Sequence, residues 1–165
     1  MRYICGHAGA RRLGEETTMA TGIPSRTGSS AASEIRIANS LSEIARVAEL
    51  VDAFGARHQF TNEVIVALNV SLDEILNNII SYAYDDAGRH DIVVRLELLG
   101  GNVEVVVEDD GRPFDPLVVP EPRLQAKPRA VGGVGLHFVR NLTDRLEYTR
   151  RDGINELRFM KELKQ

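Results

Sequence analysis

The stretch that decides the fold is IVVRLELLGGNVEVVVEDDGRPFD, residues 92–115. Apolar and polar side chains alternate through both of its halves, and Gly100 and Gly101 separate the halves. Such alternation is typical of half-buried strands, and a glycine pair between two of them favours a tight hairpin turn. The pattern therefore predicts two antiparallel strands that share one apolar face.

Asp109 lies on the apolar side of the second predicted strand, in step with the three valines 103, 105 and 107. Asp109-Asp110-Gly111 is also a common turn composition, so a strand-ending turn is the simplest interpretation. A calcium loop that includes Asp115 is the second, but the nearby prolines spoil the required ligand alternation. The inward position favours a third: an acceptor for the amino group of a base, with Gly111 allowing close approach.

A proline-rich segment follows, and five of the six prolines fall between residues 113 and 128. Spaced prolines exclude a continuous helix and an interior strand. A loop of about 20 residues far exceeds the usual ~4–6, and loops of that length are commonly lids, binding loops or disordered. We therefore expect a lid over residues 113–131.

The sequence GGVG at 132–135 begins a predicted helix. Free backbone N–H groups and the helix dipole make such a helix start suitable for phosphate. It is not a Walker loop, because no Gly-Lys-Ser/Thr follows, and no strand leads directly into it as in a Rossmann fingerprint. Hinge flexibility beside the lid is the simpler interpretation, and it is compatible with phosphate binding.

Two more helices are predicted before the strands, over residues 41–55 and 62–84. Ser40 with Glu43 matches a capping box, and Thr61 is the expected cap of the second helix. The apolar positions of the second helix nearly encircle it, which predicts a largely buried helix.

Glu74 and Asn78 interrupt that apolar surface and lie on one helix face, four residues apart. An amide oxygen and a carboxylate at this spacing suit a hard cation together with a base that orients a hydroxyl or water. A solvated polar stripe or a hydrogen bond between successive turns is the simpler interpretation of the pair alone.

Strands at 34–38, 146–150 and 155–160 complete the pattern. The order strand, two helices, two strands, loop, helix, two strands predicts an α/β (α+β) two-layer sandwich with a mixed, mostly antiparallel sheet. We expect residues 1–33 to be a flexible tail, within which Met19 is an alternative start, and residues 34–165 to be one domain.

Composition excludes several classes of protein. The net charge of −4 argues against nucleic-acid binding, and the single cysteine excludes a disulfide framework. No apolar run approaches the ~18 residues of a membrane helix, and the N-terminal segment lacks the apolar core of a secretory signal. We therefore expect a cytoplasmic protein with no nucleic-acid or membrane partner.

Together the three motifs resemble the ATP-binding (Bergerat) fold of the GHKL superfamily. Residues 74–78 resemble its Asn box, residues 109–113 its first glycine box and residues 133–136 its second. The resemblance covers about residues 34–162 and is closest to the small anti-sigma factor serine/threonine kinases. The closer match is carried by residues 77–84, 110–116 and 132–137.

The resemblance implies a sheet covered on one face by about three helices, and a site for ATP or ADP with Mg²⁺. Glu74 would accept the proton of an attacking serine hydroxyl, and Asn78 would coordinate the metal. Asp109, supported by Gly111, would accept a hydrogen bond from the adenine amino group. The other implied nucleotide contacts are Pro113, Lys127, Gly132, Gly133, Val134, Gly135 and Leu136.

The resemblance also implies a function: an ATP-dependent serine/threonine kinase and anti-sigma factor that phosphorylates a STAS-domain anti-anti-sigma protein. A sigma factor or a PP2C-type phosphatase would be a further partner, and the assembly a homodimer. A nucleotide-dependent switch that binds its partner without phosphotransfer is the alternative, and an α/β domain with coincidental glycines is a third. Asn155 stands where many relatives have a threonine, which leaves its role open.

Overall fold

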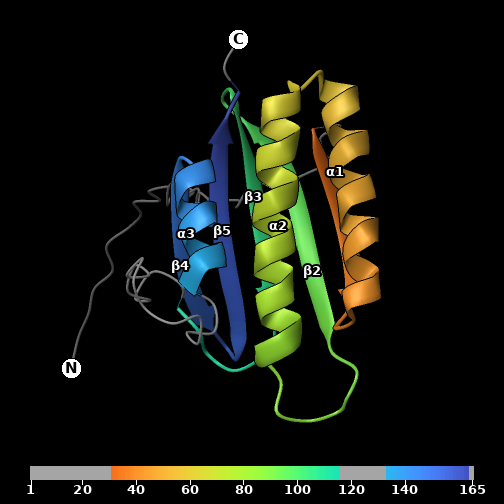
Figure 1. Ribbon diagram of the computed structural model, residues 1–165, viewed down its shortest axis with the longest axis vertical. Helices are drawn as coiled ribbons and strands as arrows, with labels where there is room; N and C mark the ends of the chain where they lie inside the picture. Colours follow the sequence, from red (N-terminus) through yellow and green to blue (C-terminus); the bar gives the residue numbers. More distant parts are fainter. Residues whose placement is uncertain (1–30, 116–132, 164–165) are drawn as a thin grey trace, which may run out of the picture.

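A five-stranded sheet carries three helices on one face (Figure 1). This computed structural model describes residues 31–115 and 133–163. The elements in chain order are β1 (Ala32–Ala38), a 3₁₀ turn (Leu41–Glu43), α1 (Ile44–His58), α2 (Asn62–Tyr82), β2 (Asp91–Leu99), β3 (Asn102–Asp109), α3 (Gly133–Leu142), β4 (Arg145–Arg151) and β5 (Ile154–Glu162).

The strand order is β1-β2-β3-β5-β4, and each of the four described pairings is antiparallel. The two-layer fold is thus confirmed, but the described sheet is not mixed. The chain returns from β3 through α3 to β4, which runs parallel to β3. β5 then folds back between these two strands, so the two parallel strands are never neighbours.

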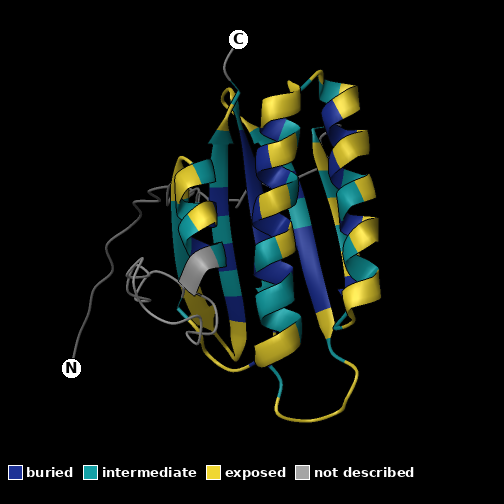
Figure 2. Cartoon of the chain, viewed as in Figure 1, coloured by how far each residue is buried: buried dark blue, intermediate teal, exposed yellow. Residues whose placement is uncertain are grey.

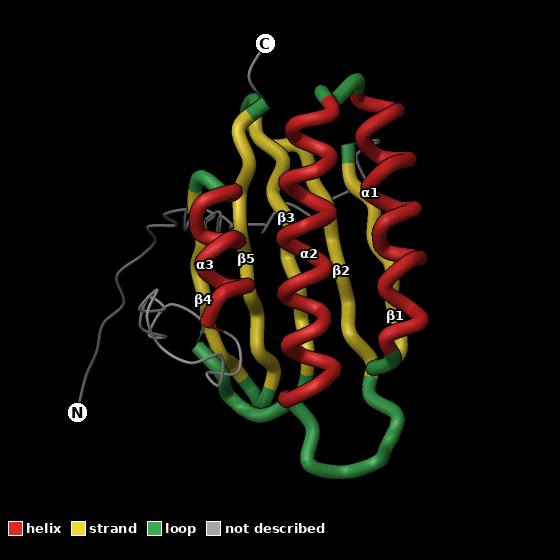
Figure 3. The backbone as a smooth tube through the Cα atoms, in the orientation of Figure 1, coloured by secondary structure: helices red, strands yellow, loops and turns green. Residues whose placement is uncertain are grey.

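The three helices form one layer, with α2 in the middle, α1 beside β1 and α3 on the β4 side (Figures 1 and 3). Their buried residues, coloured dark blue in Figure 2, lie on the sides of the helices that face the sheet. The helices contribute Val47, Val51, Phe54, Val64, Leu68, Leu72, Ile75, Leu76 and Val139 to the main core. The sheet contributes Ile37, Ile92, Val94, Leu96, Val103, Val105, Val107, Leu157 and Phe159.

α2 is more apolar than expected from the sequence. By length and composition it is the one described helix that could cross a membrane. The expectation that no segment approaches this limit was therefore wrong. In this fold α2 lies between α1 and α3, and seven of its residues are buried in the domain.

The capping box predicted at Ser40 does not form. The Ser40 hydroxyl hydrogen bonds to that of Ser42 at 2.9 Å, and Glu43 pairs with Arg46. The first turn is 3₁₀ rather than α, which changes the spacing that a capping box requires. α1 continues to His58, three residues beyond the predicted end.

The cap of α2 is confirmed: Thr61 accepts a hydrogen bond from the Val64 N–H at 3.4 Å. α2 ends at Tyr82, two residues before the predicted end, and the Ala83 carbonyl instead accepts the N–H of Arg112 at 2.8 Å. This bond joins the end of α2 to the segment that follows β3.

Both predicted hairpin turns are present. Gly100 and Gly101 have φ of 56° and 86°, and Asp152 and Gly153 have φ of 52° and 86°. Positive φ at both central residues suits the right-handed twist of the flanking strands. β1 begins at Ala32, paired with Glu97 of β2, so two residues assigned to the tail belong to the sheet.

Candidate functional site

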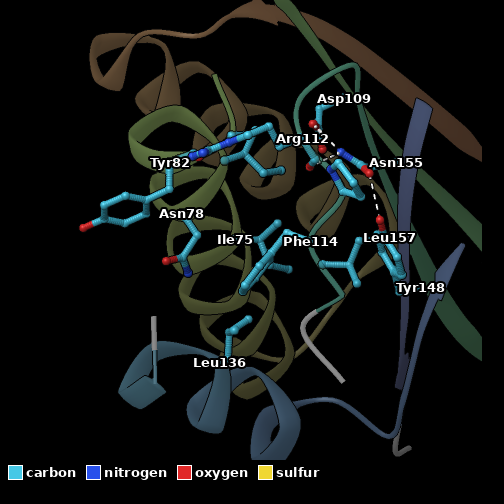
Figure 4. Close-up of a pocket in the computed structure, with 13 residues that line it drawn as sticks. Ile75, Asn78, Tyr82, Asp109, Arg112, Phe114, Leu136, Tyr148, Asn155 and Leu157 are labelled. Atoms are coloured by element: carbon cyan, nitrogen blue, oxygen red, sulfur yellow. Dashed lines mark hydrogen bonds between the residues drawn. The ribbon is translucent and has the colours of Figure 1, made fainter. Parts of the chain in front are cut away.

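A cavity of about 310 Å³ lies between α2, the start of α3 and the ends of β3, β4 and β5 (Figure 4). It is lined by Ile75, Asn78, Ile79, Tyr82, Ala83, Asp109, Arg112, Pro113, Phe114, Leu136, Tyr148, Asn155 and Leu157. Apart from Pro113, Phe114 and Asp115, the predicted lid lies outside the described residues, and so do Lys127 and Gly132. The side chains that line the cavity form an apolar wall with a few polar groups, as is usual in small-molecule sites.

Asp109 forms the polar end of this cavity and is 6% exposed, so the predicted inward position is confirmed. Its Oδ1 accepts hydrogen bonds from the Gly111 N–H and the Asn155 amide, both at 2.8 Å. Burial raises the pKa of Asp109, and these hydrogen bonds and the charge of Arg150 oppose the increase. The arrangement presents a buried hydrogen-bond acceptor to a ligand.

Gly111 is required by packing against the end of α2. A Cβ at this position would lie 2.5 Å from the Ala83 Cβ and 2.9 Å from the Ala83 carbonyl oxygen. Gly111 is not among the cavity-lining residues, so its contribution is the N–H that it donates to Asp109. The expected support of Asp109 by Gly111 is present as this hydrogen bond, and the close approach of a base to Gly111 stays a prediction.

Asn78 lines the cavity from α2, and its Nδ2 donates to the Glu74 carbonyl at 2.7 Å. The hydrogen bond between successive turns is therefore present. This bond uses one of the two Nδ2 hydrogens and leaves Oδ1 as the acceptor that Asn78 offers to a ligand.

Glu74 lies one turn earlier on α2, outside the cavity lining and directly against α3. A Cβ built on Gly135 would lie 1.8 Å from the Glu74 Oε2 and 2.6 Å from its Cδ. The carboxylate thus occupies the space that the glycine leaves. Two predicted motifs 61 positions apart in the sequence meet here, which follows from the packing of α2 beside α3.

α3 begins at Gly133, as the glycine motif predicts, and its Leu136 is buried in the cavity wall. Pro113 also lines the cavity. For Gly133 and Val134 only the helical backbone is described. Figure 4 shows α3, with Leu136, on the side of the cavity opposite Asp109.

The Asn155 side chain was not predicted as part of the site, and it is 5% exposed beneath Asp109. Tyr148 donates to its Oδ1 at 2.8 Å, and Arg150 donates to the same oxygen. One feature of the sequence pointed to this residue: Asn155 stands where many relatives of the resembled family have a threonine. The contributions of β4 could not be read from the sequence, because they depend on the pairing of β4 with β5.

The chain matches the model of the histidine kinase-like ATPase domain family over residues 37–161. It belongs to this family. The matched range contains every described motif of the site, from Glu74 through Asn155. The predicted resemblance to a GHKL-type ATP-binding fold is thus confirmed.

Two curated relatives are protein kinases. The serine/threonine-protein kinase BtrW of Bordetella bronchiseptica is 34% identical over 113 residues, which cover 66% of this chain and 73% of BtrW. The serine-protein kinase RsbW of Bacillus velezensis is 26% identical over 105 residues, which cover 60% of this chain and 66% of RsbW. The predicted kinship with anti-sigma factor kinases agrees with both.

The fold also matches a crystal structure of the RsbU and RsbW domains of a Mycobacterium tuberculosis protein, with a TM-score of 0.57 and 18% identity. The match covers 80% of this chain and 32% of that longer chain. At this identity the likeness concerns the fold alone.

A second polar cluster surrounds His90, which joins the loop after α2 to the end of β3. Its Nε2 lies 3.1 Å from Asp86 and its Nδ1 3.0 Å from Asp110, while its ring stacks on Tyr84 at 4.1 Å. The hydrogen bond with Asp86 raises the pKa of His90, and the pKa of Asp86 falls for the same reason. This cluster was not expected from the sequence.

The residues present fit a nucleotide with Mg²⁺. The described residues contain no group of three acidic, histidine or cysteine side chains that would hold a metal by itself. Mg²⁺ commonly takes one or two protein oxygens and completes its shell with phosphate and water. The amide oxygen of Asn78 beside the first turn of α3 matches that pattern, and the apolar wall with Asp109 suits a purine.

Proposed function

We propose that this chain is an ATP-dependent serine/threonine protein kinase and anti-sigma regulatory factor. Its substrate would be a serine of a STAS-domain anti-anti-sigma protein in the cytoplasm, with a sigma factor or PP2C-type phosphatase as a further partner. Membership of the ATPase family and the kinase names of BtrW and RsbW support the proposal. The observation that carries it is the carboxylate of Glu74, held at the start of α3 one turn from Asn78.

The cavity would hold the nucleotide base. Asp109 would accept the adenine amino group, and the apolar side chains of Ile75, Leu136 and Leu157 would enclose the ring. The first turn of α3 would direct backbone N–H groups at the phosphates, where the helix dipole also favours negative charge. The base and the phosphates would then occupy opposite ends of one site.

Mg²⁺, when bound, would neutralise charge on the phosphates, with the Asn78 Oδ1 as its protein ligand. Glu74 would orient the serine hydroxyl and accept its proton. Phosphoryl transfer depends mainly on positioning and electrostatic stabilisation, so a carboxylate held against the helix that receives the phosphates is well placed for this task.

A phosphotransfer assay tests the proposal. Purified chain, labelled ATP, Mg²⁺ and each STAS protein encoded in the same genome should give labelled phosphoserine on one of them. Glu74→Gln should reduce the rate by at least about a hundredfold while ADP affinity changes little, as expected for a general base. The matched control is Asp73→Asn, which alters the neighbouring exposed carboxylate and should retain activity.

Transfer to no STAS protein would contradict the kinase proposal. If ADP and a STAS protein both bind under those conditions, the alternative function, a nucleotide-dependent switch without phosphotransfer, is supported instead. Full activity of Glu74→Gln would contradict the role of Glu74 as the base.

A further inference from the structure

Asn155 stands at the centre of a hydrogen-bond network that connects β5 to the end of β3 and to β4 (Figure 4). Its Nδ2 faces three acceptors: Asp109 Oδ1 at 2.8 Å, the Arg112 carbonyl at 3.1 Å and the Gly111 carbonyl at 3.3 Å. Its Oδ1 accepts from the Tyr148 hydroxyl and from Arg150. Each side of the amide therefore faces groups of the complementary kind.

The surroundings determine which way the amide points. A flipped amide would place its oxygen against three acceptors and its NH₂ group against the Arg150 guanidinium, which only donates. Arg150 is itself held by a hydrogen bond to the Gly111 carbonyl at 2.9 Å. The donor side of Asn155 is thus locked toward Asp109.

The orientation of the Asn155 amide also determines which oxygen of Asp109 remains for a ligand. Both hydrogen bonds that Asp109 accepts within the described residues, from Gly111 and Asn155, go to Oδ1. Asp109 nevertheless lines the cavity. Its Oδ2 accepts neither of these two hydrogen bonds, so we assign this oxygen to a group that donates a hydrogen bond from a bound molecule.

We propose that Asn155, clamped by Tyr148 and Arg150, is a positioning residue that makes Asp109 a fixed acceptor and thereby sets the preference for a 6-amino purine. The inference rests on the proposed nucleotide site and assigns a role to the residue that departs from the expected threonine. A 6-oxo purine would meet a carboxylate with its own acceptor and be rejected, since a buried acceptor facing another acceptor is left unpaired.

The hydrogen bond from Asn155 also affects the pKa of Asp109. Burial raises the pKa of Asp109 and the Asn155 hydrogen bond lowers it, so loss of the hydrogen bond should raise the pKa further. The ionised carboxylate is a stronger acceptor for the amino group than the protonated carboxyl, so binding weakens as pH falls through this pKa. The other charged or titratable groups that line the cavities with Asp109 or act on it are Arg36, Tyr82, Tyr84, Arg89, His90, Asp91, Glu108, Asp110, Arg112, Tyr148 and Arg150.

The test pairs a protein variant with a ligand variant. Asn155→Leu keeps the side-chain shape without its hydrogen bonds, and purine riboside 5′-diphosphate is ADP without the 6-amino group. We expect the variant to lose about tenfold or more in ADP affinity by calorimetry, the size typical of a hydrogen bond to a charged group. Its affinity for the purine analogue should stay within about twofold.

Two further variants complete the design. Tyr148→Phe removes one hydrogen bond of the clamp and should give a smaller loss, again restricted to ADP. Asn102→Leu makes the same change at the opposite end of β3, where the side chain donates a hydrogen bond to the Leu99 carbonyl at 3.4 Å, and should alter the affinity for neither ligand. Equal losses for ADP and the analogue in Asn155→Leu, or no loss for either, would overturn the proposal.

A pH series adds a readout that a merely structural role would not change. The pH at which ADP affinity is half lost should move upward in Asn155→Leu. Carboxyl ¹³C NMR of Asp109 without nucleotide should show the same upward shift of its pKa. Wild-type protein that binds no ADP would contradict the proposed function, whereas an unchanged pKa of Asp109 in Asn155→Leu would contradict the positioning role even then.

Discussion

At the scale of single residues, the contact between Glu74 and Gly135 joins the proposed base to the helix that would receive the phosphates. The glycine is needed for the room it leaves and not for an unusual backbone, since Gly135 lies within α3 and has no positive φ. Any side chain at this position competes with the carboxylate for the same space.

Gly135→Ala is therefore expected to have effects that depend on Glu74. Alanine in a helix is favoured over glycine by up to about 1 kcal/mol, so in a Glu74→Ala background the substitution should stabilise the protein. With Glu74 present, the displaced carboxylate should cancel or reverse that gain, with a coupling of about 0.5–3 kcal/mol. Urea unfolding of the four proteins measures this coupling, and additive effects would contradict the contact.

Asp109→Asn should change which purine the site prefers. The Gly111 N–H and the Asn155 amide would hold the oxygen of the new amide, so its NH₂ group would face the cavity as a donor. We expect ADP to bind about tenfold or more weakly and the ratio of inosine diphosphate to ADP affinity to rise. Calorimetry with both ligands checks this, and an unchanged ratio would argue against base recognition by Asp109.

At the scale of elements, the loop between α2 and β2 is connected to the end of β3 through His90. Its two carboxylate partners come from the two sides: Asp86 from the loop itself and Asp110 from the segment after β3. The protonated imidazole is therefore favoured in the folded chain, because it interacts with both.

The pH dependence of stability should reveal this link. Because the pKa of His90 is raised in the folded state, its contribution is fully present below the unfolded value of about 6.5 and is lost as pH rises through the folded value. At low pH this contribution ends where Asp86 becomes protonated, because the interaction needs an ionised carboxylate, and the pKa of Asp86 is lowered in the folded state. Unfolding curves of wild type and His90→Gln should thus differ most between these two limits and converge at higher pH.

His137→Gln, at a half-buried position of α3, is the matched control for that experiment and should not reproduce the pH-dependent difference. A difference between wild type and His90→Gln that stays constant from pH 5 to pH 9 would show that the imidazole contributes by packing on Tyr84 alone.

At the scale of the whole molecule, the cavity is bounded by elements from both layers, so a ligand that fills it would hold helices and sheet together. ADP that binds only the folded chain should raise the unfolding free energy by about 2.7 kcal/mol at a concentration of 100 Kd. Thermal unfolding at increasing ADP concentration measures this. Asn102→Leu should respond as wild type does, while Asn155→Leu should need more ADP for the same rise. An unfolding midpoint that does not change with ADP concentration would contradict the nucleotide site.

Much of the fold could be predicted because it depends on local pattern. The hairpins at Gly100-Gly101 and Asp152-Gly153 are specified by positive φ at residues that tolerate it. The alternation of β3 placed Asp109 on the buried face without any knowledge of its neighbours. The capping box predicted at Ser40 was wrong, because a second hydrogen-bond partner is available nearby. The Ser40 hydroxyl pairs with that of Ser42 in a 3₁₀ turn.

By itself, the sequence determined the order of the helices and strands, the inward Asp109, the spacing of Glu74 and Asn78, and the resemblance that led to the family. Only the tertiary structure decided that Glu74 lies against Gly135 and that Asn155 holds Asp109. Periodicity reports which face of an element is buried, but not which elements become neighbours. The insertion of β5 between β3 and β4, and of α2 between α1 and α3, results from packing the two layers and joins residues that are distant in the chain.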